Sequence, residues 1–170
     1  NRDGGELTHY GDQTLVLLKS VAASSGFDIS NFADKWQQLF KSYAGYIDGA
    51  TKATIENIKA GKEPIAAGSD SDDFAGAARI APLVYRYRND LTKLIDGARA
   101  QAAVTHNNQE VIDTAAFFGS VAFNVLKGKR PLNAIQLTLN KQFNREPYSK
   151  WVEDGINSAE KDTRQAMLDL

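Results

Sequence analysis

The apolar side chains of this chain recur at the spacing of amphipathic helices along nearly its whole length. The clearest set, at positions i, i+4, i+7, i+8 and i+11, consists of Phe32, Trp36, Leu39, Phe40 and Tyr43. A second set consists of Val111, Ala115, Phe118, Ala122 and Val125. No segment alternates apolar and polar residues between hairpin turns, so we expect no strands. The sequence therefore predicts an all-α fold.

Capping and breaking residues divide this pattern into separate helices. Besides the two segments above, we expect helices at about 13 to 25, 48 to 60, 76 to 87, 89 to 104, 131 to 142 and 148 to 169. Asn31 is the predicted N-cap of the first clear helix, and Asn107, with Glu110 three residues on, of the second. Pro82 lacks an amide donor, so the helix around it should kink or begin there. The predicted helix stops are Gly26, Gly61 and Gly128.

Length and charge limit the range of functions. The 170 residues suffice for one domain with a sizeable core. With 20 basic and 21 acidic residues, the chain has no excess charge that would indicate a nucleic-acid or anionic-membrane partner. The absence of cysteine excludes disulfides and thiolate chemistry. No apolar run reaches the length of a membrane span, and the opening NRDGGEL lacks the regions of a signal peptide, so we expect a cytoplasmic protein.

Three stretches combine polar residues in ways that suggest a site. In HYGDQTLVLL, residues 9–18, a polar group directly precedes an apolar helical run and is expected to cap it. In GSDSDDFAGAARIAPL, Asp70, Asp72 and Asp73 alternate with serines before a small-residue helix start. Helix capping is the favoured role of this cluster, but its oxygens also suit Mg²⁺, Mn²⁺ or Ca²⁺. The amides of residues 75–78 could approach a phosphate, or their small side chains could simply let helices pack closely.

The remaining polar candidates have ordinary structural explanations. The third stretch, Thr105-His106 followed by two asparagines, is expected to join two helices, with His106 as a surface or hydrogen-bonding residue. Arg79, Arg86 and Arg88 could hold a phosphate, but we expect them to face water. The aromatic residues expected in the core are Trp36, Phe40, Tyr43, Phe117, Phe118 and Phe123.

These three stretches, in this order, resemble the ADP-ribosylglycohydrolases over roughly residues 8 to 170. That family includes the glycohydrolase that reactivates dinitrogenase reductase and the eukaryotic ADP-ribosylhydrolases. The segments GDQT, SDSDD and SAEKDTRQA are most similar to the branch that contains jellyfish J-type crystallins and selenoprotein J. The resemblance implies a single-domain, orthogonal multi-helix bundle over residues 1–170, incomplete at both ends relative to the family. It also implies enzymes that use a pair of Mg²⁺ or Mn²⁺ ions.

The family's first motif, a Thr-Asp-Asp-Thr run of metal ligands, corresponds here to Gly11-Asp12-Gln13-Thr14. By this resemblance Asp12 and Thr14 are metal ligands, and Asp12 is also the catalytic candidate. Gln13 stands where the family has a second carboxylate. A neutral ligand attracts a divalent cation less strongly than an anionic one, so this departure weakens the predicted metal site.

The second motif is a Gly-Asn-Gly-rich run that ends in Met-Arg before an apolar Pro-Leu. Here only Arg79 and the proline match it, and the start of the motif differs. Because this loop contacts ADP-ribose in the family, the implied substrate-binding residues are Asp70, Ser71, Asp72, Asp73 and Gly76. The Thr-His pair matches directly, which adds His106 at the border of the substrate. The family's upstream glutamate and C-terminal Asp-rich motif have no clear counterpart, although Glu6 could stand for the first.

Two functions follow from the resemblance. One is metal-assisted hydrolysis of the glycosidic bond between ADP-ribose and a protein side chain or a related small acceptor, with no nucleic-acid or membrane partner. The other is a catalytically impaired family fold that acts as a crystallin-like structural or ADP-ribose-binding protein. A weaker possibility is action on a different glycosidic or nucleotide substrate, with Asp70, Asp72 and Asp73 as the metal ligands.

Overall fold

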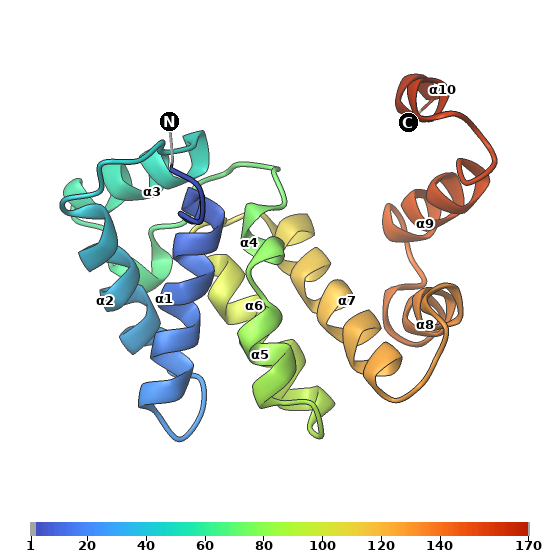
Figure 1. Cartoon of the computed structure of the whole chain (residues 1–170), viewed down its shortest axis with the longest axis horizontal. Helices are drawn as coiled ribbons and strands as arrows, with labels where there is room; N and C mark the ends of the chain where they lie inside the picture. The colour runs from blue at the N-terminus through green and yellow to red at the C-terminus, as the bar shows by residue number, and fades with distance from the viewer. Residues whose placement is uncertain (1–2, 170) are drawn as a thin grey trace. The chain divides into compact units, whose positions relative to one another are not determined.

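The computed structural model describes residues 3–169, and the expected all-α fold is confirmed over this range (Figure 1). The helices are α1 (His9–Ala23), α2 (Ile29–Phe40), α3 (Gly49–Lys59), η1 (Pro64–Ala66), α4 (Ala75–Ala78), α5 (Ala81–Arg86), α6 (Leu91–Ala103), α7 (Gln109–Leu126), α8 (Pro131–Thr138), η2 (Leu139–Phe143), α9 (Tyr148–Asn157) and α10 (Thr163–Asp169). No strand occurs among these residues. Their one isolated bridge pairs Ser69 with His106.

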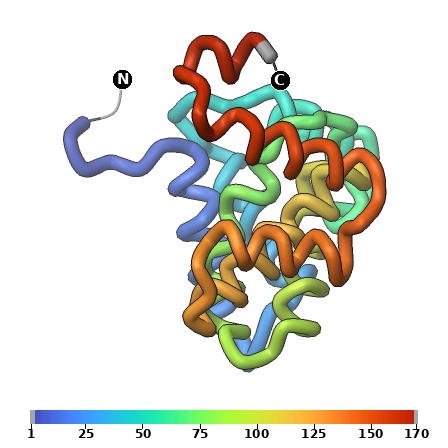
Figure 2. Tube along the Cα trace, turned by 90° about the vertical axis from the view of Figure 1, so that its right-hand side faces the viewer, coloured from blue at the N-terminus to red at the C-terminus, as the bar shows by residue number. Residues whose placement is uncertain are grey.

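The chain divides into two compact units, the first ending at Phe123 and the second beginning at Asn124. In the first unit, α1 packs against α2 and α5, and α6 packs against α2, α4 and α5 (Figure 1). The largest buried apolar side chains of this core are Leu17, Phe32, Trp36, Leu83, Leu94 and Val104. Figure 2 shows the segment before α1 running out from these helices, which agrees with the exposure of residues 3–8.

The second unit, considered by itself, has a small core. Its buried residues within the described range are Ala134, Thr138, Phe143 and Tyr148. The ring of Tyr148 makes edge contacts with the rings of Phe143 and Trp151. Since Trp151 and Ile156 stay exposed, α9 buries little of its apolar face.

Two predicted N-caps are wrong by a few residues. Helix α2 begins earlier than expected, and its N-cap is Asp28, whose side chain accepts a hydrogen bond from the amide of Asn31. The amide oxygen of Asn31 accepts instead from the hydroxyl of Ser20. At α7, the cap is Asn108, which accepts from the amides of Glu110 and Val111.

The polar group of the first motif lies inside α1 and does not cap it. The helix begins at His9, and its N-cap Thr8 makes no side-chain capping bond. Asp12 therefore lies in the first turn of the helix, and Gln13 and Thr14 follow it. This correction matters for the site because successive residues of a helix face different directions.

Three other expectations also need correction. The segment 76–87 forms two short helices, and Pro82 lies in the first turn of the second, so the predicted start at this proline is confirmed. The last predicted helix is interrupted between α9 and α10. Phe118 is exposed and does not belong to the core.

None of the described helices is long and apolar enough to cross a membrane. The single domain remains a prediction, as does the cytoplasmic location.

Candidate functional site

The three motif stretches meet at the buried guanidinium of Arg79. This side chain, only 2% exposed, donates from Nη1 to Gln13 Oε1 at 2.9 Å and from Nη2 to Thr105 Oγ1 at 2.7 Å. It also donates from Nε to Gln101 Oε1 at 2.6 Å and from Nη2 to the Gln101 carbonyl at 2.8 Å. The prediction that Arg79 faces water was therefore wrong. Arg79, which directly follows α4, therefore connects that helix to α1, to α6 and to the Thr-His junction.

The acceptors of Arg79 are neutral, so burial dominates its electrostatics. Burial lowers the pKa of Arg79 to about 10, although the negative charges of Asp48 and Asp73 act in the opposite direction. The ring of Phe32 lies 5.5 Å from the guanidinium carbon and adds a cation–π contact. Arg79 nevertheless remains charged at neutral pH.

Gln13, at the position where the resemblance implies a carboxylate, points into this core. Its Oε1 accepts from Arg79 and also from Trp36 Nε1 at 2.8 Å, and the residue is 2% exposed. Its neighbour Asp12 faces a different environment, described below. Gln13 is thus part of a buried hydrogen-bond network in this structure.

The acidic loop is fastened to the Thr-His junction through Ser69. The Ser69 amide donates to the carbonyl of Thr105 at 2.9 Å, and the Asn107 amide donates to the carbonyl of Ser69 at 2.6 Å. The hydroxyls of Ser69 and Thr54 donate to the same Thr105 carbonyl. A Cβ on Gly68 would lie 2.5 Å from the Ala103 carbonyl oxygen, so only glycine permits this close approach.

His106 lies beneath the loop and is 1% exposed, so it is a buried hydrogen-bonding residue. Its Nδ1 is 2.8 Å from Thr105 Oγ1, and its Nε2 is 3.1 Å from Asp73 Oδ1. Burial lowers the pKa of His106, and the positive charge of Arg79 lowers it further, against the opposing effect of Asp73. His106 is therefore neutral at pH 7.

Asp73 is the member of the acidic cluster with defined partners. It accepts from the Ala75 amide at 2.8 Å and from the Ser71 hydroxyl at 2.8 Å, in addition to His106. Partial burial would raise the pKa of Asp73, but these hydrogen bonds and His106 lower it below its ordinary value. Asp73 thus binds the first amide of α4 from the position before the N-cap, which is Phe74 and makes no side-chain capping bond. All three aspartates of the cluster are exposed, and Asp73 alone has these partners on the His106 side.

Gly76 lets α4 lie directly on the histidine ring. A Cβ at this position would be 2.9 Å from His106 Nδ1. The Gly76 carbonyl accepts from Gln101 Nε2 at 2.6 Å, and the same amide group donates to the Ala98 carbonyl. The structure thus brings the proposed substrate-binding residues Ser71, Asp73, Gly76 and His106 together.

Asp12 lines a separate surface pocket of about 760 Å³ between the start of α1 and residues 39–46. The hydroxyl of Tyr43 donates to Asp12 Oδ2 at 2.6 Å. His9 and Tyr46 also line this pocket, with their rings in edge contact. Thr14 does not line it, and its hydroxyl donates to the carbonyl of Tyr10 within the helix.

A buried histidine and a buried carboxylate lie close together beside this pocket. His9 Nε2 is 3.2 Å from Asp48 Oδ2, and both side chains are about nine-tenths buried. Asp48 is also the N-cap of α3 and accepts from the amide and hydroxyl of Thr51. Neither the His9–Asp48 pair nor the Tyr43–Asp12 bond was foreseen from the sequence.

The residues present do not by themselves fit a divalent metal. Over the described range, no three His, Cys, Asp or Glu side chains come close enough to hold an ion. Of the two predicted ligands, the Asp12 carboxylate is bonded to Tyr43 and the Thr14 hydroxyl to its own helix. Because Mg²⁺ and Mn²⁺ require several oxygen ligands, Asp12 and Thr14 alone do not complete a site.

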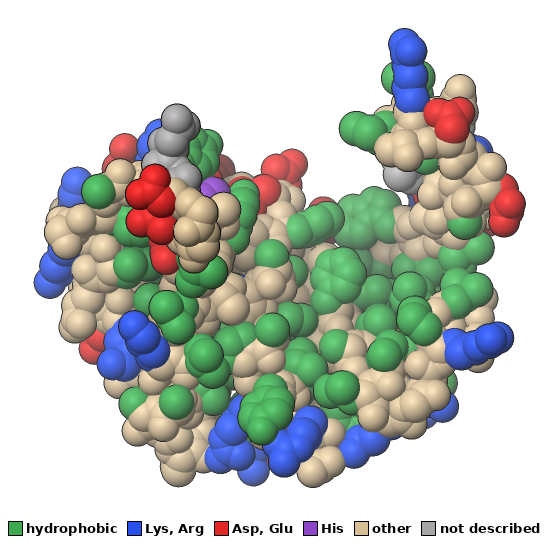
Figure 3. Space-filling model, viewed as in Figure 1, with side chains coloured by type: hydrophobic (Ala, Val, Ile, Leu, Met, Phe, Trp, Pro, Cys, Tyr) green, Lys and Arg blue, Asp and Glu red, His purple; other side chains and the backbone are tan. Residues whose placement is uncertain are grey.

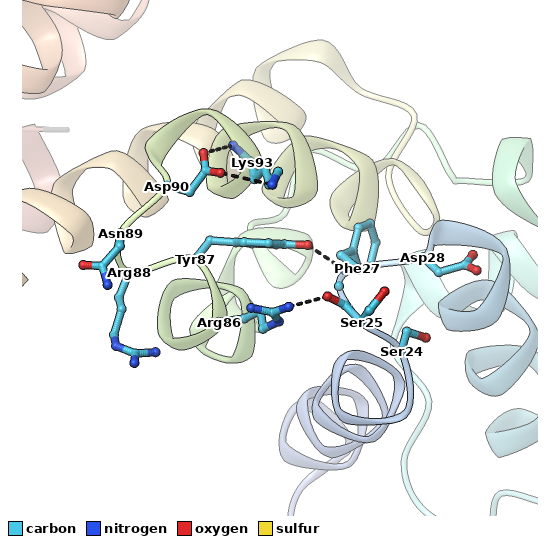
Figure 4. A pocket seen from close by; sticks show the side chains of 11 residues that line it. Ser24, Ser25, Phe27, Asp28, Arg86, Tyr87, Arg88, Asn89, Asp90 and Lys93 are labelled. Carbon is cyan, nitrogen blue, oxygen red and sulfur yellow. Dashed lines mark hydrogen bonds and ion pairs between the residues drawn. The ribbon is translucent and has the colours of Figure 1, made fainter.

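Another pocket, of about 560 Å³, lies between the turn after α1 and the turn before α6, and none of the motif residues line it (Figure 4). The hydroxyl of Tyr87 accepts from the Phe27 amide at 2.7 Å, and Arg86 donates to the Ser25 carbonyl. Figure 3 shows Arg and Lys side chains at this end of the first unit and acidic side chains near the start of α1. This pocket therefore lies outside the motif network.

Comparison with known proteins identifies the family. The ADP-ribosylglycohydrolase family profile matches residues 2–169. The chain belongs to the ADP-ribosylglycohydrolase family. The predicted resemblance and the all-α class are thus confirmed, and the domain is one found in hydrolases of glycosidic bonds.

Curated relatives share this domain at low identity. An uncharacterized protein from Archaeoglobus fulgidus is 32% identical over 124 residues, which is 72% of this chain and 39% of the relative. Crystallin J1A and crystallin J1B from the jellyfish Tripedalia cystophora are 24% and 25% identical, over 81% and 76% of this chain. The aligned regions are 47% and 44% of the crystallins, so the chain spans less than half the length of these relatives.

Proposed function

We propose that the chain forms part of a hydrolase that cleaves the glycosidic bond between ADP-ribose and a protein side chain or a related small acceptor. The observation that supports this most directly is the network around Arg79, which joins the three family motifs through Gln13, Thr105 and His106. Family membership over residues 2–169 supplies the reaction class.

The proposed roles follow from chemistry and position. The loop from Asp70 to Asp73, with Gly76, binds the ADP-ribose group, and His106 supports it from below. Asp12, which lines the pocket and is bonded to Tyr43, has the proposed role of accepting a proton from an attacking water. Bound Mg²⁺ or Mn²⁺ would supply Lewis acidity, with Asp12 and Thr14 among its ligands. These two residues do not complete a metal site, so the roles above are assigned to the side chains of this chain alone.

The second candidate is a family fold that binds ADP-ribose or acts structurally without catalysis. Two observations favour it: Gln13 is committed to Trp36 and Arg79 in the core, and two of the matched relatives are named crystallins. The two candidates differ in metal binding and turnover. In both candidates that bind ADP-ribose, the loop from Asp70 to Asp73 above His106 is the binding segment.

Calorimetric titration separates the candidates. Mg²⁺ and Mn²⁺ are titrated with and without ADP-ribose, into this chain and into the natural polypeptide that contains it. Asp12→Asn is the test variant, and Asp34→Asn, an exposed carboxylate on α2, is the matched control. The hydrolase predicts that metal and ADP-ribose bind together, that only Asp12→Asn removes the metal heat, and that an ADP-ribosylated protein releases ADP-ribose.

Binding of ADP-ribose without metal or turnover would favour the non-catalytic candidate. If neither the metal ions nor ADP-ribose bind to the natural polypeptide, the hydrolase proposal is contradicted and the crystallin-like role is left.

A further inference from the structure

The hydrogen bonds that lead from Arg79 to Asp73 run in one direction. Arg79 Nη2 has only hydrogens to give, so Thr105 Oγ1 must accept at this 2.7 Å contact. The hydroxyl retains one hydrogen of its own. Two acceptors are available to that hydrogen, His106 Nδ1 at 2.8 Å and the Ala102 carbonyl at 3.5 Å. The shorter contact is the better hydrogen bond, so Nδ1 is the acceptor.

The other side of the ring leads to the same assignment. Asp73 Oδ1 lies 3.1 Å from His106 Nε2 and is an anion that can only accept. An unprotonated Nε2 would place two lone pairs against each other. A doubly protonated ring is disfavoured because His106 is buried near the charge of Arg79. Nε2 therefore carries the proton, and three donors point outward in series.

We propose that Thr105 is a positioning residue that holds His106 in its Nε2–H tautomer, so that a permanent N–H donor orients Asp73 and the acidic loop toward ADP-ribose. Thr105 can do this because Arg79 donates to one lone pair of the hydroxyl, and Nδ1 is the nearest acceptor for the hydroxyl hydrogen. A bonded series of this kind is strengthened by mutual polarisation. His106 acts through Asp73, because the histidine is 1% exposed and the Asp73 side chain is 45% exposed.

The N–H group of His106 helps to hold the acidic loop in place through Asp73. Asp73 receives the His106 N–H, the Ala75 amide and the Ser71 hydroxyl, so one carboxylate fixes both the loop and the start of α4. The part of this inference that concerns ADP-ribose rests on the proposed function. The tautomer itself does not.

The tautomer is measured by long-range ¹H–¹⁵N NMR of protein labelled at histidine. The chain has two histidines, so His9→Asn assigns both rings. The wild type should show a protonated Nε2 and an unprotonated Nδ1 for His106 at neutral pH. Asp73→Ala removes the acceptor at Nε2, and the tautomer should persist because Thr105 still donates to Nδ1.

The decisive comparison uses two double variants. In Asp73→Ala/Thr105→Val no group selects a tautomer, and the spectrum should become that of a mixture. In Asp73→Ala/Thr105→Ser the hydroxyl returns, and the Nε2–H tautomer should return with it. A protonated Nδ1 in the wild type or in Asp73→Ala, or identical spectra for the two double variants, would overturn the proposal.

Calorimetry with ADP-ribose tests the consequence for binding. Thr105→Ser should bind as the wild type does, whereas Thr105→Val should bind about fivefold more weakly, as expected for the loss of one hydrogen bond. Equal affinities would overturn the positioning role. Absence of ADP-ribose binding to the wild type would refute the proposed function, and the NMR spectra would still decide the tautomer.

Discussion

At the scale of single residues, the site depends on close contacts that only certain side chains allow. Gly68 is the tightest of these positions, because a Cβ there would lie 2.5 Å from a backbone carbonyl oxygen and 2.9 Å from the amide nitrogens of His106 and Asn107. Backbone atoms cannot move away as a flexible side chain can. The contact between the loop and the Thr-His junction therefore requires glycine.

We predict that Gly68→Ala lowers the free energy of unfolding by about 1–3 kcal/mol, the usual cost of overpacking. Urea unfolding, followed by the fluorescence of Trp36 in a Trp151→Phe background, measures the change. Gly49→Ala is the control, because a Cβ there meets nothing within 4 Å, and its effect should stay within about 0.5 kcal/mol. An equal effect of the two variants would contradict the close approach of Gly68 to the junction.

The buried neutral His106 should make stability depend on pH. Its pKa in the folded state is lowered from 6.5, so below pH 6.5 the unfolded chain binds a proton that the folded protein does not. The groups that set this behaviour are Arg79, Asp73, Asp48 and the hydroxyl of Thr105. The contribution is fully present above pH 6.5 and is lost as the pH falls through the folded-state value.

We therefore expect the free energy of unfolding of the wild type to fall between pH 7 and pH 5, and the slope to be smaller in His106→Gln. The comparison uses urea unfolding at each pH, because slopes are independent of any constant effect of the substitution. Identical slopes for His106→Gln and the wild type would show that His106 titrates normally.

At the scale of helices, the caps decide where each element begins. Asp28 precedes α2 in an extended conformation and accepts from the amide of Asn31 at 3.0 Å. We predict that Asp28→Ala costs about 1 kcal/mol of stability, within the range known for lost N-caps. Asp34→Ala, on the exposed side of the same helix, should cost less than about 0.5 kcal/mol. Urea unfolding compares the two, and a larger loss for Asp34→Ala would place the cap elsewhere.

The helices were predictable because their signal is local. The spacing from Phe32 to Phe40 identifies α2 without knowledge of what covers it, although Tyr43, the last residue of the predicted pattern, lies beyond the end of the helix. Pro82 marks the start of α5. The caps were less predictable, since Asp28 and Asn31 are both good N-cap residues and only the backbone conformation chooses between them. Phe118 has the right spacing for burial, but spacing does not show whether another element covers that face.

The candidate site was predictable as a set of stretches, and its connections were not. The acidic residues before α4 suggested a cap, and Asp73 accepts from the first amide of α4, although Phe74 holds the N-cap position. Nothing local predicts that Arg79 is buried or that Gln101 supports it, since these depend on contacts across more than 20 residues of sequence. The buried amides of Gln13 and Gln101 are ordinary polar residues in the sequence and acquire their role only from the packing of α1, α4 and α6.

At the scale of the whole molecule, the two units differ in how many side chains they bury. The first contains the core around Trp36, which is 0% exposed, together with the motif network. The second buries Ala134, Thr138, Phe143 and Tyr148 among its described residues. Since apolar burial is the main stabilising term and a unit of about 50 residues is marginal by itself, we expect the second unit to unfold first.

The two tryptophans allow this to be measured, because Trp36 lies in the first unit and Trp151 in the second. In Trp151→Phe, fluorescence reports only Trp36 and should show one transition at higher urea concentration. The wild type should show an additional change at lower urea from Trp151, and far-UV circular dichroism should follow both steps. Coincident transitions for all probes would instead show that the chain unfolds as one cooperative body. In that case α7, which runs from Gln109 to Leu126 across the boundary between the units, is the continuous element that would transmit the coupling.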